Sequence, residues 1–142
     1  MTQEYKELLL KDLCARLPYG VKCCIYNFGE DTIRIKEDIL WSVQGDNILT
    51  LKSCVEKGEA YMYHQIKPYL FPLSSMTEEQ KQEYTYIVNY ISPDDTDTWK
   101  EGEFIYIEQV TQLLHFYLIN HLDYRGLIPK ELALDATGLN IY

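Results

Sequence analysis

Between residues 21 and 66 one short β-type segment follows another across tight turns, and this spacing restricts the fold more than any other feature. VKCCIYNF is rich in β-branched and aromatic residues, and TIRIKE alternates isoleucine with charged side chains. DILWSVQ and NILTLKS flank Gly45 and Asp46, which predicts a hairpin, and EAYMYHQI can add a further short strand. Parallel strands need long crossover connections, so this region predicts an antiparallel sheet or small open barrel of about four or five strands.

Helical periodicity lies on both sides of this region. Apolar residues at three- and four-residue spacing predict a helix over Gln3–Arg16, which Pro18 and Gly20 terminate. The same spacing predicts helices over 77–91 and 106–122. The last of these has apolar residues on several sides and is expected to be the most buried helix. Together with the strands, the helices predict an α+β fold.

The segments between the predicted strands and helices add details to the predicted fold. Pro68 and Pro72 exclude a regular helix between the sheet region and the second helix and favour an extended crossing. Two capping-box patterns precede that helix, Ser75 with Glu78 and Thr77 with Gln80. Residues 92–104 are the most polar stretch and are expected to form a surface loop. No repeat or linker divides the chain, so we expect one α+β domain over 1–142 with an irregular C-terminal tail.

The formal net charge of −9 disfavours some classes of binding partner and favours others. Non-specific nucleic-acid binding depends on neutralising phosphates with Lys and Arg, so it is disfavoured, although one local pocket could still hold a small nucleotide. An acidic protein suits a basic protein surface. No apolar run approaches the ~20 residues that span a bilayer, and the N-terminus has no signal-peptide pattern. We therefore expect a cytoplasmic protein that does not contact membranes.

In that compartment the four cysteines are expected to be reduced thiols. They are Cys14, Cys23, Cys24 and Cys54. Cys23 and Cys24 are adjacent in a predicted strand, where neighbouring side chains point to opposite faces, so they form no CxxC element. We interpret these cysteines as small hydrophobic residues, buried in the core.

Patterns that carry catalysis or bind cofactors are weak. His115 and His121 are six residues apart on a helix and do not share a face, and no glycine-rich phosphate loop is present. Asp95 and Asp97 resemble the start of a calcium loop, but Trp99 occupies the third ligand position. We therefore expect no metal and no cofactor, and the balance favours a protein that is not an enzyme.

The segment DYRGLIP, residues 123–129, follows the last helical pattern and allows two interpretations. In the first, Gly126 supplies the left-handed residue that closes a helix, Arg125 favours the negative helix end, and Pro129 prevents continuation. In the second, Tyr124 and Arg125 lie at the mouth of a pocket and stack on or pair with an anionic ligand.

Two further turn-like segments, RLPYGVK and IKPYLFP, also place Tyr beside cations. We therefore predict a ligand-binding surface on which these cations converge. Its residues are Tyr19, Lys22, Lys67, Tyr69, Tyr124 and Arg125. The expected occupant is a small anionic ligand or a host protein.

The stretches LLLKDLCARLPYGVKC, IKPYLFPLSSMTEEQKQEY and HLDYRGLIPKELALDA resemble a family of small uncharacterised proteins encoded by phages and prophages of gut Bacteroidales. The resemblance holds in order and spacing over part of the chain. This chain departs from it at Phe71 and Leu73, where the family often has a basic residue and Met, and at Glu131, where the family often has Gly. The family has no established activity, so the resemblance implies only a phage-borne protein in the bacterial cytoplasm.

In that context we predict a non-enzymatic binding protein that sequesters a small nucleotide-like signal or blocks a host defence protein. The 13 Tyr residues against 4 Phe suit such a binding surface, because Tyr combines contact area with a polar tip. A structural or assembly accessory of the phage, able to form a homo-oligomer, is the first alternative. A small hydrolase with a cryptic site is the second.

Overall fold

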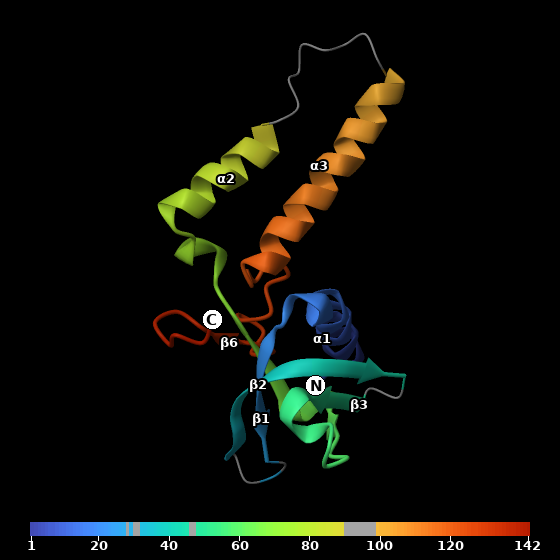
Figure 1. Ribbon diagram of the computed structural model, residues 1–142, viewed down its shortest axis with the longest axis vertical. Helices are drawn as coiled ribbons and strands as arrows, with labels where there is room; N and C mark the ends of the chain where they lie inside the picture. The colour runs from blue at the N-terminus through green and yellow to red at the C-terminus, as the bar shows by residue number, and fades with distance from the viewer. Residues whose placement is uncertain (28, 30–31, 46–47, 90–98) are drawn as a thin grey trace.

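The computed structural model shows an α+β fold in which two helices, α2 and α3, project from the part that contains the sheet (Figure 1). It describes residues 1–27, 29, 32–45, 48–89 and 99–142, without the side chains of 99–107. The main elements are α1 (Gln3–Arg16), β1 (Lys22–Tyr26), β2 (Ile33–Gln44), β3 (Ile48–Leu51), β4 (Tyr61–Met62), β5 (Ile66–Leu70), α2 (Glu78–Asn89), α3 (Trp99–Ile119) and β6 (Leu134–Asp135). We call α1, the strands and their connections the base, and α2 with α3 the arm.

The strands form one sheet in the order β4-β3-β2-β1-β5-β6. All neighbouring strands are antiparallel except β5 and β6, which are parallel. One face packs against α1, where Leu9 and Leu13 join the main apolar cluster of the sheet. On the other face the C-terminal tail covers part of β1 and β5, where its Ala136 and Ile141 join the cluster of Cys24 and Tyr69. The predicted antiparallel sheet is therefore confirmed for the first five strands.

The strand pattern differs from the prediction in three places. β2 runs without a break through TIRIKE and DILWSVQ, because no turn residue separates them. The extended crossing is itself a strand, β5, in which Pro68 lies opposite Cys23. Pro68 is tolerated there because β6 pairs only with Tyr69 and Leu70. The tail, predicted to be irregular, supplies β6 through contacts that no local pattern indicates.

The helices follow the predicted order with different boundaries at α3. α1 spans Gln3–Arg16 as predicted. At the start of α2, Thr77 N donates to Gln80 Oε1 at 2.9 Å and Gln80 N donates to Thr77 Oγ1 at 3.2 Å, which confirms one of the two capping boxes. α3 begins at Trp99, inside the predicted polar loop, because Lys and Glu are good helix formers and a single glycine is tolerated. The rest of that loop, with the calcium-like pattern at Asp95 and Asp97, lies outside the described residues.

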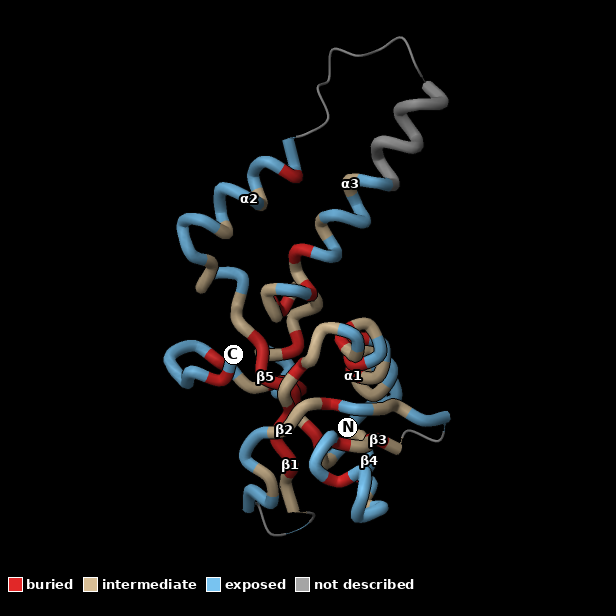
Figure 2. Tube along the Cα trace, viewed as in Figure 1, coloured by how far each residue is buried: buried red, intermediate tan, exposed pale blue. Residues whose placement is uncertain are grey.

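The prediction that α3 is the most buried helix is wrong. Among its residues 108–119 only Phe116 and Leu118 are buried, whereas α1 buries four side chains, including Asp12 and Arg16 (Figure 2). The arm helices pack on each other along one line, with Gln109 Nε2 donating to Ile87 O at 2.9 Å. The remaining apolar positions of α3 have no covering layer among the described residues.

All four cysteines are free, and three of them are buried. Cys23 lies in the cluster facing α1 and Cys24 in the cluster facing the tail, which confirms that their side chains point to opposite faces. Cys14 is exposed, so the prediction of burial fails for this residue. No helix in the described part of the chain is long and apolar enough to cross a bilayer.

Candidate functional site

α3 ends before DYRGLIP, at a cap formed by His121. His121 has a φ of 54°, its N–H donates to Leu118 O at 3.2 Å, and Leu122 N donates to Tyr117 O at 2.9 Å. This is the hydrogen-bond pattern of a Schellman motif, with histidine in the left-handed position that glycine usually occupies. Gly126 is also left-handed, with φ 70°, but it lies in the following turn. The prediction that Gly126 closes the helix is therefore wrong.

Arg125 reaches across to the first helix instead of binding the end of α3. Its Nε lies 3.3 Å from Asp12 Oδ1 and donates to the Tyr124 hydroxyl at 3.1 Å. Its guanidinium carbon is 4.9 Å from the centre of the Tyr124 ring, a cation–π distance. Tyr124 in turn stacks on Tyr117 of α3, with ring centres 5.1 Å apart.

Asp12 and Arg16 form a buried ion pair one helical turn apart. Both side chains are 0% exposed, and Arg16 Nε donates to Asp12 Oδ2 at 2.6 Å. Arg16 Nη2 donates to Leu122 O at 2.7 Å, which ties the end of α1 to the chain just after α3. Arg16 also lies 5.4 Å from the centre of the Tyr124 ring, so that ring contacts two guanidinium groups. The buried ionic junction is thus made of Asp12, Arg16, Tyr124 and Arg125.

The electrostatics of this junction favour a structural role. Burial raises the pKa of the Asp12 carboxyl, and the positive charges of Arg16 and Arg125 oppose that rise. Asp12 Oδ1 and Arg16 Nη1 make no hydrogen bond within the described residues. Arg125 itself is 21% exposed on its side chain and already paired. The junction therefore holds α1 against the 122–125 segment and offers little free charge to a ligand.

Three other predicted site residues lie on the sheet face covered by the tail. Lys22 Nζ donates to Ile141 O at 2.6 Å, and Lys67 Nζ lies 5.5 Å from the centre of the Tyr26 ring. Tyr69 is 5% exposed and donates its hydroxyl proton to Lys36 O at 2.7 Å. Burial raises the pKa of the Tyr69 phenol above its usual range. These side chains help to attach the tail and neighbouring strands.

The six predicted residues therefore fall into three places. Tyr124 and Arg125 lie against α1, Lys22, Lys67 and Tyr69 lie beneath the tail, and Tyr19 lies beside α3. No hydrogen bond, ion pair or ring contact among the described residues joins one of these groups to another, although the charges of Arg16, beside Tyr124, and of Lys22 both act on His121. A ligand-binding role for each residue stays a prediction.

His121 has a second structural contact besides its cap. Its ring stacks on Tyr142, with centres 3.6 Å apart and planes 12° from parallel. Burial, with the nearby charges of Arg16 and Lys22, lowers the pKa of His121 to about 4. The Tyr142 hydroxyl donates to Tyr69 O at 2.9 Å and accepts from Lys22 N at 2.9 Å. The neutral imidazole thus forms part of the seat of the C-terminal tail.

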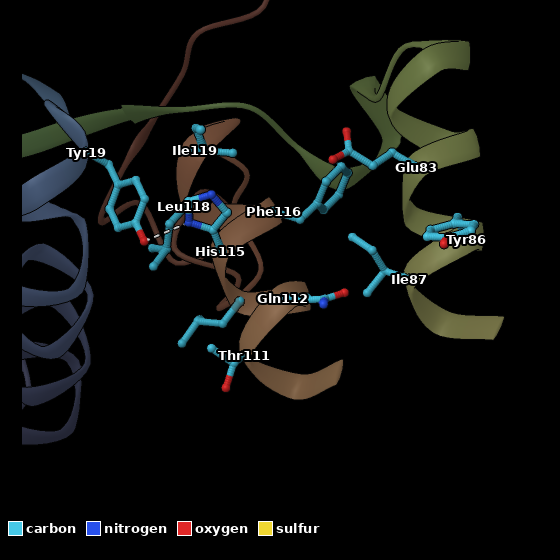
Figure 3. A pocket seen from close by; sticks show the side chains of 11 residues that line it. Tyr19, Glu83, Tyr86, Ile87, Thr111, Gln112, His115, Phe116, Leu118 and Ile119 are labelled. Atoms are coloured by element: carbon cyan, nitrogen blue, oxygen red, sulfur yellow. Dashed lines mark hydrogen bonds between the residues drawn. The ribbon is translucent and has the colours of Figure 1, made fainter. Parts of the chain in front are cut away.

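A groove of about 660 Å³ lies along α3 between α2 and the end of α1 (Figure 3). Tyr19 approaches from the α1 side, where its hydroxyl and His115 Nδ1 are 3.0 Å apart. The groove is lined by residues of both helices and of the turn after α1, among them Tyr19, Glu83, Tyr86, Leu114, His115 and Ile119. Its size falls within the range of clefts that hold ligands, and its lining is mainly apolar.

No charge or metal chemistry stands out in this arm groove. Within the described residues, no three His, Cys, Asp or Glu side chains are grouped so that they could hold a metal ion. The arrangement can bury an apolar surface and place a carboxylate, Glu83, at its margin.

Comparisons with protein-family models, with curated proteins and with solved structures found no match to this chain. The interpretation of the arm groove and of the ionic junction therefore depends on their own geometry.

The predicted site includes neither Asp12 nor Arg16, although Arg16 belongs to the segment RLPYGVK and a helical signal for both residues exists. Asp12 lies three residues after Leu9, and Arg16 lies three after Leu13, so all four share the buried face of α1. A charged pair on an apolar helix face indicates a buried ion pair or a site. Its partner Arg125, by contrast, could not be identified from helical spacing.

Proposed function

We propose that this protein is a non-catalytic binding protein whose arm groove receives an amphipathic, positively charged helix of a partner protein. In the setting that the resemblance implies, the partner is a bacterial host protein, and the phage-encoded chain covers it in the cytoplasm. The observation that carries this proposal is the uncovered apolar groove along α3.

The apolar residues of the arm support a protein partner. Three exposed large apolar side chains line the groove, namely Tyr86 at 67%, Leu114 at 39% and Ile119 at 53%, and Val88 and Val110 are exposed elsewhere on the same two helices. Single exposed apolar residues are ordinary, but a group of them beside a groove is typical of an interaction surface. A partner helix lying in the groove would pack on both α2 and α3. Amphipathic helices bind hydrophobic grooves in this way, with their apolar face turned into the groove.

The charges of the arm indicate which helix would bind. The described side chains of α2 and of residues 108–119 carry four carboxylates and one ammonium group. The carboxylates are Glu78, Glu79, Glu83 and Glu108, and the ammonium group is that of Lys81. A basic partner would be attracted to this surface, whereas a second copy of a chain with a net charge of −9 would be repelled. The proposal therefore commits to a basic helix and not to self-association.

The small-ligand alternative has weaker support. An anion needs unpaired cations, but Lys22 already contacts the tail and Arg125 already contacts Asp12. Binding an anion at either place would require these contacts to break, and each would then leave a buried polar group without its partner.

Site-specific photocrosslinking tests the proposal. A photoreactive phenylalanine derivative replaces Tyr86 in the arm or, as control, the exposed Lys57 in the base, and the protein is expressed in a gut Bacteroidales host. We expect one predominant protein to be captured from position 86 and not from position 57. Because capture alone does not establish binding, the captured protein is then purified and its affinity measured by calorimetry.

Two matched variants decide the outcome of that measurement. Ile119→Asp and Leu139→Asp each place a carboxylate at a position that is 53% exposed, but only Ile119 lines the groove. We expect Ile119→Asp to weaken binding by about tenfold or more, since it buries an unpaired charge in the interface, and Leu139→Asp to leave binding unchanged. Equal effects of the two variants, or binding that strengthens with salt, would refute the proposal.

A further inference from the structure

A second exposed surface, unrelated to the arm groove, surrounds Trp41 in the base. Trp41 is on β2 and is 54% exposed, which is unusual for so large an apolar side chain. Two hollows of about 570 and 480 Å³ flank it, and both are lined by Trp41 and Val55. An indole that lines two hollows and is half exposed is accessible to a ligand in either of them.

The backbone of β2 is shaped to expose this indole. The pairing with β3 shifts register between Leu40 and Ser42, so that Trp41 is an additional, bulged residue. Leu40 and Val43 both pack against the core although they are three residues apart, which a regular strand with period two does not allow. The bulge therefore turns Trp41 and Ser42 towards the same outer surface, where both line the larger hollow.

The polar groups of the larger hollow are neutral and unused. Ser42, Gln44 and Thr50 line it, and their side chains make no hydrogen bond to the described residues. Glu59 is the one described carboxylate there, and it accepts a hydrogen bond from the Tyr61 hydroxyl at 2.9 Å and lies 3.6 Å from Arg34. Among the described residues, the hollow thus combines an aromatic side chain with free hydroxyl and amide groups, and its one carboxylate is paired.

We propose that Trp41 and the larger hollow bind a neutral saccharide. The C–H groups on one face of a sugar ring carry a slight positive charge and pack on the negative face of an indole. Sugar hydroxyls donate and accept, as do the Ser, Thr and Gln side chains beside the indole. A nucleic-acid base could also stack on Trp41, but a strand of phosphates needs a cationic groove, and the described residues that line the larger hollow include no Lys or Arg.

NMR titration of the full chain tests this inference directly. Trp41 and Trp99 are the two tryptophans of the chain, so the indole N–H region should hold two resonances, assigned with Trp41→Phe. The probes are maltotetraose, cellotetraose and chitotetraose at up to about 10 mM, a range that detects weak sites. We expect at least one of them to shift the Trp41 resonance in a saturable way.

Variants distinguish a specific site from general contact. We expect Trp41→Ala to weaken saccharide binding by about tenfold or more, and Ser42→Ala with Thr50→Ala to weaken it to a smaller degree. Leu139→Ala, at an exposed apolar position outside both hollows, should leave it unchanged. No shift with any probe would overturn the inference, as would saccharide-induced shifts of backbone amides in β2 and β3 that keep the same affinity in Trp41→Ala. A Trp41 resonance that responds to the captured partner protein and not to saccharides would overturn it in favour of a protein interface.

Discussion

In the base, the apolar residues that lie between α1 and the sheet are buried, with Leu9, Leu13 and Leu70 at 0% exposure, whereas in the arm Leu114 and Ile119 remain 39% and 53% exposed. Both regions contain helices with apolar faces. The difference is that the sheet offers α1 a broad surface to cover, while α2 offers α3 only a single line of contact. An apolar helix face is therefore buried by what the fold places next to it, not by its own pattern.

This difference separates stability from binding within one chain. The base has a continuous core and a buried ionic junction, so we expect it to unfold cooperatively at high free energy. The arm has a small cluster around Ile87 and Phe116, so we expect it to open locally at lower free energy. The surface proposed to bind a partner thus belongs to the less stable region.

The largest effect is expected from the ionic junction of the base. Asp12→Ala leaves Arg16 buried without its carboxylate, which should lower the free energy of unfolding by about 3–5 kcal/mol, measured by urea denaturation. The matched change in the arm, Glu78→Ala, removes the exposed partner of Lys81 and should change it by less than about 0.5 kcal/mol. The double variant Asp12→Ala with Arg16→Met should recover much of the loss. A small effect of Asp12→Ala would contradict the assignment of a buried pair.

A smaller and local effect is expected at the centre of the arm. Ile87→Ala should lower the free energy of local opening by about 2 kcal/mol, because it leaves a cavity beside Phe116. Hydrogen exchange should then accelerate in α2 and leave the base unchanged. Val88→Ala, at the exposed neighbouring position, serves as the control and should have little effect. Equal acceleration throughout the base would show that arm and base unfold as one unit.

The pH dependence of the free energy of unfolding should show the contribution of the neutral His121 ring, which stacks on Tyr142 of the C-terminal tail. The pKa of His121 is about 4 in the folded protein and near its usual value of 6.5 when unfolded, so between these values the unfolded chain binds the additional proton. Stability is therefore fully present above about pH 6.5 and falls as the pH decreases towards 4, by about 1–2 kcal/mol after allowance for solvent screening. His121→Asn keeps a residue that tolerates positive φ and should remove this part of the pH dependence. Parallel pH profiles for the two proteins would contradict the assignment.

The smallest effect is expected at the start of the arm. Thr77→Ala removes the side chain that accepts from Gln80 N and should destabilise α2 by about 1 kcal/mol, measured as faster hydrogen exchange in its first turn. Ser74→Ala, at an exposed position before the cap, is the comparison and should leave exchange unchanged. If both variants behave alike, the capping box contributes nothing measurable.

Features that depend on neighbouring residues could be predicted well. The helix over Gln3–Arg16, the capping box at Thr77 and the hairpin between β2 and β3 all follow from local spacing and turn chemistry. The end of α3 could not be predicted in the same way. Gly126 is left-handed as predicted, but it is His121, also left-handed, that closes α3, and the His121 ring stacks on Tyr142 at the far end of the tail.

The candidate sites show the same difference between features set by nearby residues and features set by distant ones. Helical spacing was sufficient to indicate that Asp12 and Arg16 share the face of Leu9 and Leu13. It could not indicate that Arg16 meets Leu122, 106 residues away, or that six predicted site residues lie in three separate places. Nor could it indicate that the apolar face of α3 stays uncovered.

By itself, then, the sequence determined the α+β class and the type and order of most secondary structure elements, because hydrophobic period, caps and turns act within a few residues along the chain. Only the tertiary structure decided which charges are paired, which apolar face is left exposed, and where β6 and the tail are attached. These outcomes depend on contacts between distant segments, and the free energy of such contacts is set by burial and geometry that exist only after the chain has folded.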